Sequence, residues 1–330
     1  MKEILNYLFE HKTMSQEMAH DILVNISKGL YNESQLAAFM TVFLMRSITV
    51  EELSGFRQAL LELCVRVSLN GSDVLDIVGT GGDGKNTFNI STLSCFIAAG
   101  AGAHVSKHGN YGVSSVSGAS NVMESLGYKF SNDQGKLQTE LEQAGICFLH
   151  APLFHPALKN VSQVRKQLGV RTFFNMLGPL VNPAFPRFQM IGVYSLEIAR
   201  AYHYVFQQTD KQYVILHSLD GYDEISLTDD TRILSNRGEK NYTPEELGKR
   251  MVTAEDIYGG ATVQEATGMF TRILKGEGSP AQTAVVLANA AVGVHCMGAY
   301  PTLEDSYLAA VESLESGKAF GALEKLINLQ

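Results

Sequence analysis

The chain has 330 residues, of which 45% are hydrophobic and 18% charged, a composition typical of a globular enzyme of one or two domains and not of a disordered protein. Its formal net charge is −8, and no run of lysines or arginines exceeds two residues, which argues against a nucleic-acid partner. No apolar run approaches the roughly 20 residues that span a bilayer, and the four scattered cysteines indicate reduced thiols, so we expect a cytoplasmic protein with no membrane partner.

The first 70 residues follow a helical pattern, from which we expect four short helices. Three pairs of residues have the spacing of a capping box ahead of apolar positions: Thr13 and Gln16, Asn32 and Gln35, and Thr49 and Glu52. The apolar stripe over 36–44 is too broad for one exposed helix. This region should therefore pack on itself and on another surface, such as a second subunit.

From Val74 onward, short apolar runs alternate with helical patterns. Strands are predicted at 74–78, 103–106, 146–149, 188–194 and 213–217, and helices at 93–99, 117–126, 135–143 and 196–207. This alternation predicts an α/β fold with a mostly parallel central sheet flanked by helices, beside a smaller all-helical N-terminal domain.

Two segments depart from this alternation. Residues 151–186 are rich in proline and contain a helical pattern at 159–168, so we expect them to leave the sheet and contact the N-terminal helices. From Thr262 the chain is again helical, with alanine-rich apolar faces that should cover the sheet.

A glycine-dense loop follows the first predicted strand. Glycines at 79, 81, 82 and 84 allow positive φ and close approach of the backbone to a ligand. Asn89, Ser91 and Thr92 then act as cap-type residues before a helix whose free N–H groups and positive dipole end favour an anion. The loop is therefore a candidate phosphate site, although a simple tight turn is the alternative.

A second polar loop follows the next predicted strand. It has the sequence KHGNYG over 107–112, followed by Ser114, Ser115 and Ser117. Because adjacent parallel strands open their ligand crevice at their carboxyl ends, we expect both loops to face one cleft and to divide a pyrophosphate and a monophosphate between them. Lys107 is interpreted as a phosphate clamp in preference to a solvated surface charge.

Two adjacent carboxylates, Asp223 and Glu224, lie in the turn after the strand predicted at 213–217. Such a pair commonly faces solvent. With phosphates expected across the cleft, however, these oxygens suit Mg²⁺, which binds a few carboxylates together with substrate phosphates. Ser91 is able to add a hydroxyl ligand from the first loop.

The segment 151–184 offers an aromatic and proline-rich wall beside cationic side chains. Arg165 is able to grip a carboxylate with two hydrogen bonds, which suits an aromatic acid. His155 fits a structural histidine and a ligand contact equally well, and Arg171 also fits a purely structural role.

Six motifs in this order and spacing resemble the anthranilate phosphoribosyltransferase family over nearly the whole chain: GTGGD at 79–83, NIST at 89–92, KHGN at 107–110, HPA at 155–157, VRKQLGVRTFFNMLGPLVNPA at 164–184 and DE at 223–224. The resemblance implies a helical domain of residues 1–70, joined in space by part of 160–185, beside an α/β phosphoribosyl pyrophosphate-binding domain of residues 71–330. It also implies a homodimer formed through the helical domain.

The resemblance further implies a reaction. The amino nitrogen of anthranilate attacks C1 of phosphoribosyl pyrophosphate, giving N-(5-phosphoribosyl)anthranilate in tryptophan biosynthesis, and magnesium pyrophosphate leaves. No residue is assigned as acid or base, because a neutral aryl amine is nucleophilic and sheds its proton after attack.

The resemblance also implies site residues. Those for phosphoribosyl pyrophosphate are Gly79, Gly82, Asp83, Thr87, Asn89, Ile90, Ser91, Thr92, Lys107, His108, Gly109, Ser115 and Ala119. Those for anthranilate are Gly79, Asn110, His155 and Arg165. Two Mg²⁺ per active site are implied, one on Ser91 and Glu224 and one on Asp223 and Glu224.

Two positions depart from the family pattern. Many relatives have arginine after KHGN and aspartate near the start of the next helix, where this chain has Tyr111 and Asn121. The change either weakens phosphate binding by one charge-assisted hydrogen bond or, if the usual pair is a mutual salt bridge, is nearly neutral.

Two other functions stay open as alternatives. A pyrimidine-nucleoside phosphorylase-like enzyme shares the single loops but carries a different, lysine-, serine- and threonine-rich glycine loop. A non-enzymatic nucleic-acid-binding paralogue shares the fold, but the acidic balance and the set Arg165, Asp223 and Glu224 argue against it.

Overall fold

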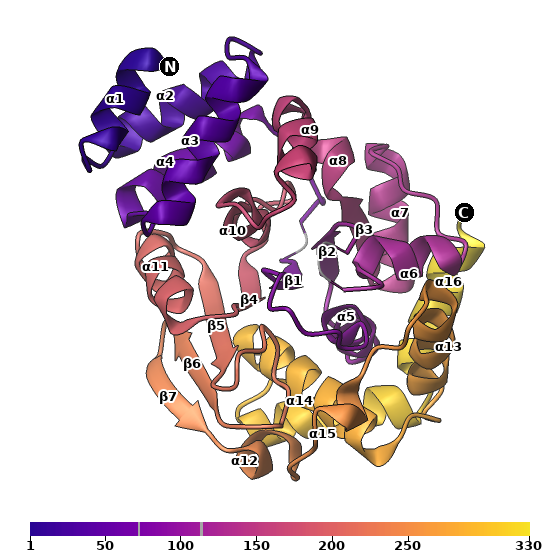
Figure 1. Ribbon diagram of the computed structural model, residues 1–330. Coiled ribbons are helices and arrows are strands. Elements are labelled where there is room, and N and C mark those ends of the chain that lie inside the picture. The colour runs from indigo at the N-terminus through magenta and orange to yellow at the C-terminus, as the bar shows by residue number, and fades with distance from the viewer. Residues whose placement is uncertain (72, 113–114) are drawn as a thin grey trace. The chain divides into compact units, whose positions relative to one another are not determined.

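The computed structural model describes residues 1–71, 73–112 and 115–330, so Ser114 of the second predicted loop lies outside the described residues. The chain divides into two compact units (Figure 1). Unit 1 contains Met1–Arg66 and Ala151–Pro183, and unit 2 contains Val67–His150 and Ala184–Gln330. Each unit is therefore built from two separate stretches of sequence.

Unit 1 is helical. Its first stretch contains α1 (Lys2–Phe9), α2 (Gln16–Ser27), α3 (Glu33–Met45) and α4 (Val50–Leu63), which agrees with the expected four helices. Its second stretch contains α8 (Ala151–Phe154), α9 (Lys159–Leu168) and α10 (Phe174–Leu177), with 3₁₀ turns at Pro156–Leu158 and Gly178–Leu180.

Side-chain caps explain where the helices of unit 1 begin. The capping boxes of Asn32 with Gln35 and of Thr49 with Glu52 are both present. The prediction of a cap at Thr13 is wrong, because Ser15 caps α2 by accepting a hydrogen bond from the Met18 N–H. The hydroxyl of Ser15 stands at the N-cap position itself, where it reaches the third amide of the helix.

An aromatic cluster joins the two stretches of unit 1. The ring of Phe173 stacks on that of Phe56 with centroids 4.7 Å apart, and it lies 4.7 Å from Phe43 and 6.0 Å from Phe39. All four rings are buried. Aromatic pairs of this geometry add to the hydrophobic stabilisation of a core, so the stretch 151–183 completes the core of the helical unit.

In unit 2, the described residues form one sheet with the strand order β3-β2-β1-β4-β5-β6-β7. The strands β1 (Leu75–Gly79), β2 (Val105–Gly109), β3 (Ile146–His150), β4 (Phe188–Gly192) and β5 (Gln212–Ser218) pair in parallel. The strands β6 (Thr231–Ser235) and β7 (Gly238–Tyr242) add an antiparallel edge. The predicted fold class, a mostly parallel sheet flanked by helices with an N-terminal helical region, is confirmed.

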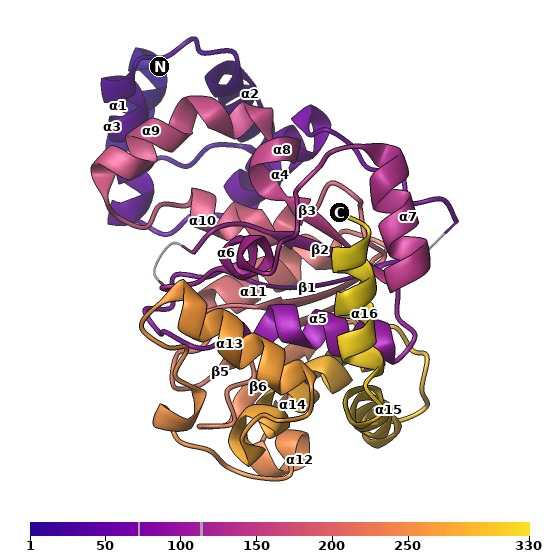
Figure 2. The same cartoon turned by 90° about the vertical axis from the view of Figure 1, so that its right-hand side faces the viewer.

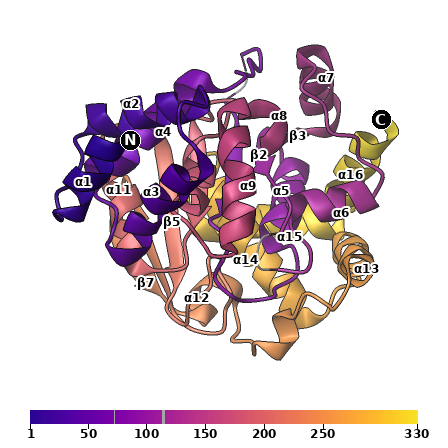
Figure 3. The same ribbon diagram turned by 45° about the horizontal axis from the view of Figure 1, so that its top comes forward.

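Helices cover both faces of the sheet. On one face, α5 (Ile90–Gly100) and α14 (Pro280–Cys296) pack on the strands, and α13 (Val263–Leu274), α15 (Leu303–Glu315) and α16 (Lys318–Asn328) cover them (Figure 2). α11 (Leu196–Gln207) packs on β5 and β6 (Figure 3). The remaining helices of unit 2 are α6 (Ala119–Ser125), α7 (Gln134–Ala144) and α12 (Pro244–Gly248), with a 3₁₀ turn at Glu255–Ile257.

Two predictions about strands were wrong. The second strand was expected at 103–106, but β2 covers Val105–Gly109 and therefore includes Lys107 and His108, because both residues pair with β3 through their backbone and have buried side chains. The hairpin β6–β7 was missed. β7 has the sequence GEKNY and is mostly exposed, so it lacks the apolar alternation by which a strand is recognised.

No helix among the described residues is long and apolar enough to cross a membrane.

Candidate active site at the switch point of the sheet

The candidate site lies at the carboxyl ends of β1 and β4. From β1 the chain moves outward through β2 to β3, and from β4 it moves the opposite way through β5. In doubly wound sheets, ligands bind where the strand order reverses in this manner, because the loops on either side part and leave a crevice. The strand register pairs Gly79 of β1 with Gly192 of β4 at this point.

Because these two glycines have no side chains, the turn that contains Asp223 and Glu224 is able to lie against the ends of both strands. A Cβ atom on Gly192 would lie 1.6 Å from the main-chain carbonyl oxygen of Asp223, and one on Gly79 would lie 2.5 Å from its Oδ2. Both separations are far below contact distance. Asp223 therefore rests directly on the ends of two strands, and Gly79 has a steric role in addition to the ligand contacts predicted for it.

The glycine loop wraps around the Asp223 carboxylate. Oδ2 of Asp223 accepts hydrogen bonds from the Gly81 N–H at 2.6 Å and from the Thr80 hydroxyl at 3.3 Å. Gly81, Gly82 and Gly84 have φ of 64°, 73° and 77°, conformations that L side chains rarely adopt. Gly79, in contrast, is the last residue of β1.

Glu224 caps helix α5 from outside the local sequence. Its Oε1 accepts a hydrogen bond from the Ser91 N–H at 2.9 Å, and its Oε2 accepts one from the Thr87 hydroxyl at 3.3 Å. The positive end of the helix dipole favours a carboxylate here. Of the predicted cap residues, Asn89 occupies the N-cap position but its side chain makes no capping hydrogen bond, and Ser91 and Thr92 lie within the helix.

Three carboxylates gather at this point. Burial, and then the neighbouring carboxylate of Asp83, raises the pKa of Asp223 to about 7. Burial, and then Asp223, raises the pKa of Glu224 well above its usual value. Burial also raises the pKa of Asp83, whose Oδ1 accepts a hydrogen bond from the Lys85 N–H at 2.9 Å. The three carboxylates therefore concentrate more negative charge here than the neighbouring hydrogen-bond donors and cations balance.

The donor chemistry of this cluster fits Mg²⁺. Asp223 and Glu224 supply carboxylate oxygens, and Ser91 supplies a hydroxyl beside Glu224, which are hard ligands of the kind that Mg²⁺ prefers. A divalent cation would relieve the mutual repulsion that, after burial, raises the pKa of Asp223 and Glu224. No group of three or more His, Cys, Asp or Glu side chains in the described part of the chain has the arrangement of a complete protein metal site. The residues present therefore fit a cation that takes its other ligands from a phosphate substrate and water.

Lys107 lies beneath the glycine loop. Its side chain is buried, and Nζ donates to the main-chain carbonyl of Ile77 at 2.6 Å and to the Ser91 hydroxyl at 3.4 Å. The prediction that Lys107 belongs to the second loop is wrong, since it is a residue of strand β2. Its ammonium nevertheless provides a fixed positive charge below the start of α5.

Two asparagines tie the second loop to the first. The Asn89 side-chain amide donates to the Ser117 carbonyl at 2.8 Å, and the Asn86 side-chain oxygen accepts from the Val116 N–H at 3.3 Å. Ser115 lies in the same segment, with its hydroxyl 3.4 Å from the Ser117 carbonyl. The structure therefore brings the described parts of both loops together.

The two family departures have distinct partners in the second loop. Asn121 accepts hydrogen bonds through Oδ1 from the N–H groups of Gly112 and Gly118, both at 3.0 Å, and so closes the loop. The Tyr111 hydroxyl donates to Glu124 at 2.7 Å, and its ring meets the edge of His150 with centroids 4.9 Å apart. The loop is therefore held without the arginine and the aspartate of the family pattern.

The other predicted contacts divide between accessible and buried groups. Asn110 is exposed and Gly109 is partly exposed at the end of β2, and Ala119 is the first residue of α6. The side chains of Ile90, Thr92 and His108 are buried. Any ligand contact of Thr92 would therefore involve its main-chain N–H in the first turn of α5, whereas the Ile90 N–H donates to the Phe88 carbonyl at 2.6 Å.

Arg165 and His155 belong to unit 1. Arg165, on α9, donates to the Asn175 side chain at 3.3 Å and stands 5.6 Å from the centre of the Phe174 ring. Among the described residues, no acidic side chain forms an ion pair with it. Burial lowers the pKa of His155 to about 4, so its imidazole is neutral at physiological pH.

Sequence reasoning missed three residues that shape the site. Lys85 in the glycine loop lies 4.5 Å from the centre of the Tyr222 ring, directly before Asp223. Asn289 of α14 accepts from the Ile225 N–H at 3.1 Å and donates to its carbonyl at 2.8 Å, which fixes the residue after Glu224. Lys85 was visible as the cation within the loop, but nothing in the local pattern around Asn289 connects it to a turn 64 residues away.

Comparisons with known proteins agree with this geometry. The model of the glycosyl transferase family a/b domain matches residues 71–320, and the model of the helical bundle domain of that family matches residues 2–64. The chain is 56% identical to the anthranilate phosphoribosyltransferase of Flavobacterium johnsoniae over 329 residues, which cover 100% of this chain and 99% of that protein.

Solved structures show the same fold. The anthranilate phosphoribosyltransferase of Thermus thermophilus is 31% identical and has a TM-score of 0.91, with 98% of each chain covered. Two structures of the Saccharomyces cerevisiae enzyme, one with phosphoribosyl pyrophosphate and Mg and one with 4-fluoroanthranilate, have TM-scores of 0.87 and 0.84 at 28% and 26% identity. They cover 96% of this chain and 93% and 92% of the yeast chains.

The two family models together cover most of the sequence, and the structure has a glycine loop folded around Asp223 and a helix capped by Glu224. The chain therefore belongs to the glycosyl transferase family of the anthranilate phosphoribosyltransferases.

Proposed function

We propose that the chain transfers the phosphoribosyl group of phosphoribosyl pyrophosphate to the amino group of anthranilate, giving N-(5-phosphoribosyl)anthranilate and pyrophosphate in tryptophan biosynthesis. One observation carries the proposal. Asp223 and Glu224 are held by hydrogen bonds against the glycine loop and the first turn of α5, so hard oxygen ligands for a cation lie directly beside a loop and a helix start that suit a phosphate.

The glycine loop and the start of α5 bind the pyrophosphate in this proposal. Positive-φ glycines let the backbone of the loop approach phosphate oxygens closely, and the helix dipole favours negative charge at the same place. Lys107 adds a buried positive charge beneath Ser91. Together these groups stabilise the charge that develops on the leaving pyrophosphate. Asp83, Thr87, Ser115 and the other predicted contacts complete the binding of the sugar-phosphate substrate.

We infer that Ser91, Asp223 and Glu224 hold Mg²⁺, one ion on Ser91 and Glu224 and a second on both carboxylates. When bound, Mg²⁺ neutralises charge on the pyrophosphate leaving group. Mg²⁺ is present with phosphoribosyl pyrophosphate in the yeast relative. Titration of the protein with Mn²⁺ in the presence of phosphoribosyl pyrophosphate, followed by electron paramagnetic resonance, should give two bound ions per chain.

Arg165 is proposed to bind the carboxylate of anthranilate through its guanidinium, and Asn110 and Gly79 to contact the same substrate. An arginine with no acidic partner among the described residues suits a substrate carboxylate. His155 stays neutral and offers a hydrogen bond without charge. The reaction needs no protein base, because the aryl amine attacks in its neutral form, so positioning and electrostatics supply the rate.

The first prediction tests the acceptor site. Replacement of Arg165 by alanine should raise the KM for anthranilate by at least tenfold, about 1.4 kcal/mol of binding, and change the KM for phosphoribosyl pyrophosphate much less. Loss of anthranilate fluorescence with time measures both constants. Lys166→Ala, which removes the exposed neighbouring cation on α9, is the control. Equal effects on the two KM values would place the acceptor elsewhere.

The same assay separates the alternatives. Purified protein should consume anthranilate only when phosphoribosyl pyrophosphate and Mg²⁺ are both present. Release of free base from thymidine or uridine with inorganic phosphate alone would favour a nucleoside phosphorylase. Inactivity in both assays, with salt-sensitive DNA binding, would favour the non-enzymatic paralogue.

We also propose a homodimer formed through unit 1. Apolar side chains remain exposed on its α1 and α3 helices, namely Phe9 at 58%, Leu44 at 45% and Met45 at 83%, and clusters of this kind mark protein interfaces. Sedimentation velocity should give twice the mass of the chain, and Met45→Glu should shift the protein toward the monomer. A cytoplasmic location is proposed on the basis of charged substrates that do not cross membranes.

A further inference from the structure

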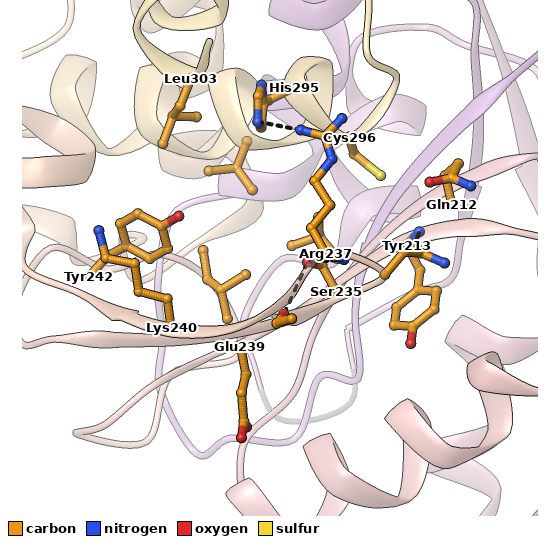
Figure 4. A pocket seen from close by; sticks show the side chains of 15 residues that line it. Gln212, Tyr213, Ser235, Arg237, Glu239, Lys240, Tyr242, His295, Cys296 and Leu303 are labelled. Atoms are coloured by element: carbon orange, nitrogen blue, oxygen red, sulfur yellow. Dashed lines mark hydrogen bonds between the residues drawn. The ribbon is translucent and has the colours of Figure 1, made fainter. Parts of the chain in front are cut away.

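Unit 2 contains a pocket of about 270 Å³ that shares no residue with the candidate active site (Figure 4). It lies between the antiparallel edge of the sheet and the C-terminal end of α14. Strand β5 contributes Tyr213 and Val214, the β6–β7 hairpin contributes Ile233 and Arg237, and α14 contributes Val292 and His295. The pocket is therefore built from regular elements of the unit.

The wall of the pocket is apolar. Val214, Ile233 and Val292 are buried and face it from three elements, and Leu303 closes it from the start of α15. Tyr242 also lines it, whereas the ring of Tyr213 packs on His203 and Phe206 of α11. A surface of this kind accepts the apolar body of a small molecule, and its volume lies just below the roughly 300–1,000 Å³ that is usual for drug-sized ligands.

Arg237 brings an uncompensated positive charge to the pocket. Its side chain extends toward α14 (Figure 4), where Nη1 donates to Nε2 of His295 at 3.1 Å. Burial, and then the charge of Arg237, lowers the pKa of His295, so the imidazole accepts this hydrogen bond in its neutral form. In the described part of the chain, Arg237 takes part in no ion pair.

The other charges of the pocket are already paired. Glu239, whose side chain points away from Arg237 in Figure 4, pairs with Arg232 at 2.5 Å. Lys240 pairs with Glu246 at 3.0 Å. Arg237 is thus the cation with donors to spare, since a guanidinium has five N–H groups.

The turn that carries Arg237 is fixed before any ligand binds. The Ser235 hydroxyl accepts from the Arg237 N–H at 3.2 Å and donates to the Gly238 carbonyl at 3.1 Å. Asn236 accepts from the Tyr213 N–H at 2.7 Å and donates to the Lys211 carbonyl at 2.9 Å. A turn tied to β5 in this way loses little entropy when a ligand binds.

We propose that this pocket is a second binding site, for a small aromatic carboxylate whose ring packs on Val214, Ile233 and Val292 and whose carboxylate pairs with Arg237. The apolar wall selects a flat hydrocarbon body, and the planar guanidinium selects a planar anion that accepts two parallel hydrogen bonds. The site is independent of the proposed catalytic function.

Methyl NMR of the full-length protein with 1-naphthoate tests the proposal. Saturable shifts are expected for the methyl groups of Ile233, Val292 and Leu303. Arg237→Gln should weaken this binding by at least tenfold. Arg250→Gln, which alters an exposed arginine that does not line the pocket, should leave it unchanged. The neutral amide 1-naphthamide should bind the wild-type protein more weakly than 1-naphthoate.

The design separates this site from the active site. The same titration of Arg165→Ala, which lacks the proposed acceptor anchor, should show the methyl groups of Ile233, Val292 and Leu303 shifting as in the wild type. Absence of shifts at these methyls at millimolar 1-naphthoate would overturn the proposal. So would shifts that Arg237→Gln leaves intact, and the methyl spectrum of that variant itself shows whether it has folded.

Discussion

Glu224 shows how one side chain is able to link a helix start to a distant turn. Most helices begin with a local serine, threonine, aspartate or asparagine whose oxygen accepts an N–H of the first turn. In α5 that acceptor is Glu224, which reaches the Ser91 N–H from 133 residues away. A substrate phosphate or a cation that engages Glu224 would therefore act directly on the end of α5.

Lys85 is the residue through which we expect the glycine loop to add charge to substrate binding. Its ammonium lies over the Tyr222 ring beside the carboxylate cluster. Lys85→Met should raise the KM for phosphoribosyl pyrophosphate about tenfold, the equivalent of one charge-assisted hydrogen bond, with little change in the KM for anthranilate. Steady-state kinetics measure both. Lys275→Met removes a lysine over the ring of Phe320 and should change neither, and an unaltered KM in Lys85→Met would exclude this role.

His155 should make the stability of the protein depend on pH. Its pKa is about 4 in the folded chain because of burial, against about 6.5 when unfolded. Between these values the unfolded chain binds a proton that the folded chain does not, so the free energy of unfolding falls as the pH is lowered. At about 1.4 kcal/mol for each pKa unit, the loss approaches about 3 kcal/mol.

His155→Gln removes this contribution. Between about pH 7 and pH 5, where the histidine of the unfolded chain titrates, the thermal midpoint of the variant should fall less steeply than that of the wild type. The exposed His104 provides the control, and His104→Gln should follow the wild type. Parallel curves for wild type and His155→Gln would contradict the assignment.

Residues with local signals were predicted better than residues whose role depends on tertiary contacts. The glycines at 81, 82 and 84 take positive φ as expected, and Asp223 and Glu224 lie beside the first loop. Asn89 was expected to cap a helix, but its amide binds the Ser117 carbonyl instead. No pattern in the sequence encodes that partner, because the hydrogen bond forms only after both loops have been placed by the sheet.

At the scale of elements, the start of α4 is stabilised by one buried acid. Glu52 accepts hydrogen bonds from Arg46 at 2.8 and 2.5 Å, from the Thr49 N–H at 3.0 Å and from the Met14 N–H at 2.9 Å. It therefore closes its own capping box and also ties the segment before α2 to α4. The capping box was evident from spacing, whereas the hydrogen bond to Met14 was not.

Glu52→Gln should destabilise unit 1 by about 3 kcal/mol, because it leaves Arg46 without its negative partner in a largely buried place. Denaturant unfolding followed by circular dichroism should show a lower midpoint. Glu51→Gln changes the exposed neighbouring acid of the same helical turn and should leave the midpoint close to that of the wild type. Similar midpoints for both variants would mean that water solvates the Arg46 guanidinium well enough to replace its ion pair with Glu52.

Element boundaries followed the strength of the periodic signal. The helices predicted at 159–168 and 196–207 have these limits in α9 and α11, because their apolar and polar faces alternate clearly. β2 was placed too early because lysine and histidine look like loop residues, yet both are buried and their backbone pairs with β3. β7 was missed because it is a mostly exposed antiparallel edge strand, which has no need of apolar side chains on both faces.

At the scale of the whole molecule, unit 1 is assembled from two stretches that are distant in sequence. Phe173 packs among rings of α3 and α4, and the Arg57 side chain donates to the Leu180 carbonyl at 3.2 Å. We therefore expect a fragment of residues 1–66 to lack a complete core. Its circular dichroism should show little cooperative thermal unfolding, since the rings that Phe173 covers would be exposed.

A single-chain fusion of 1–66 to 151–183 through a flexible linker is the matched comparison. It restores Phe173 and Leu180, and it should unfold cooperatively. If the fragment 1–66 unfolds as cooperatively as the fusion, the second stretch contributes little to the core. The general architecture was predictable from the alternation of patterns, but the membership of 151–183 was visible only as an interruption of the sheet.

The glycine pair at positions 79 and 192 has a consequence for how the protein tolerates change. Asp223 lies against Gly192 through its main-chain carbonyl, which no rotamer is able to move aside, and against Gly79 through its carboxylate. A larger residue in place of either glycine would therefore displace the turn that carries Asp223, even though Gly192 is not among the residues predicted to bind a ligand. The spacing and twist between β1 and β4 thus determine where the carboxylates lie relative to the glycine loop. The backbone of the sheet is itself a component of the site.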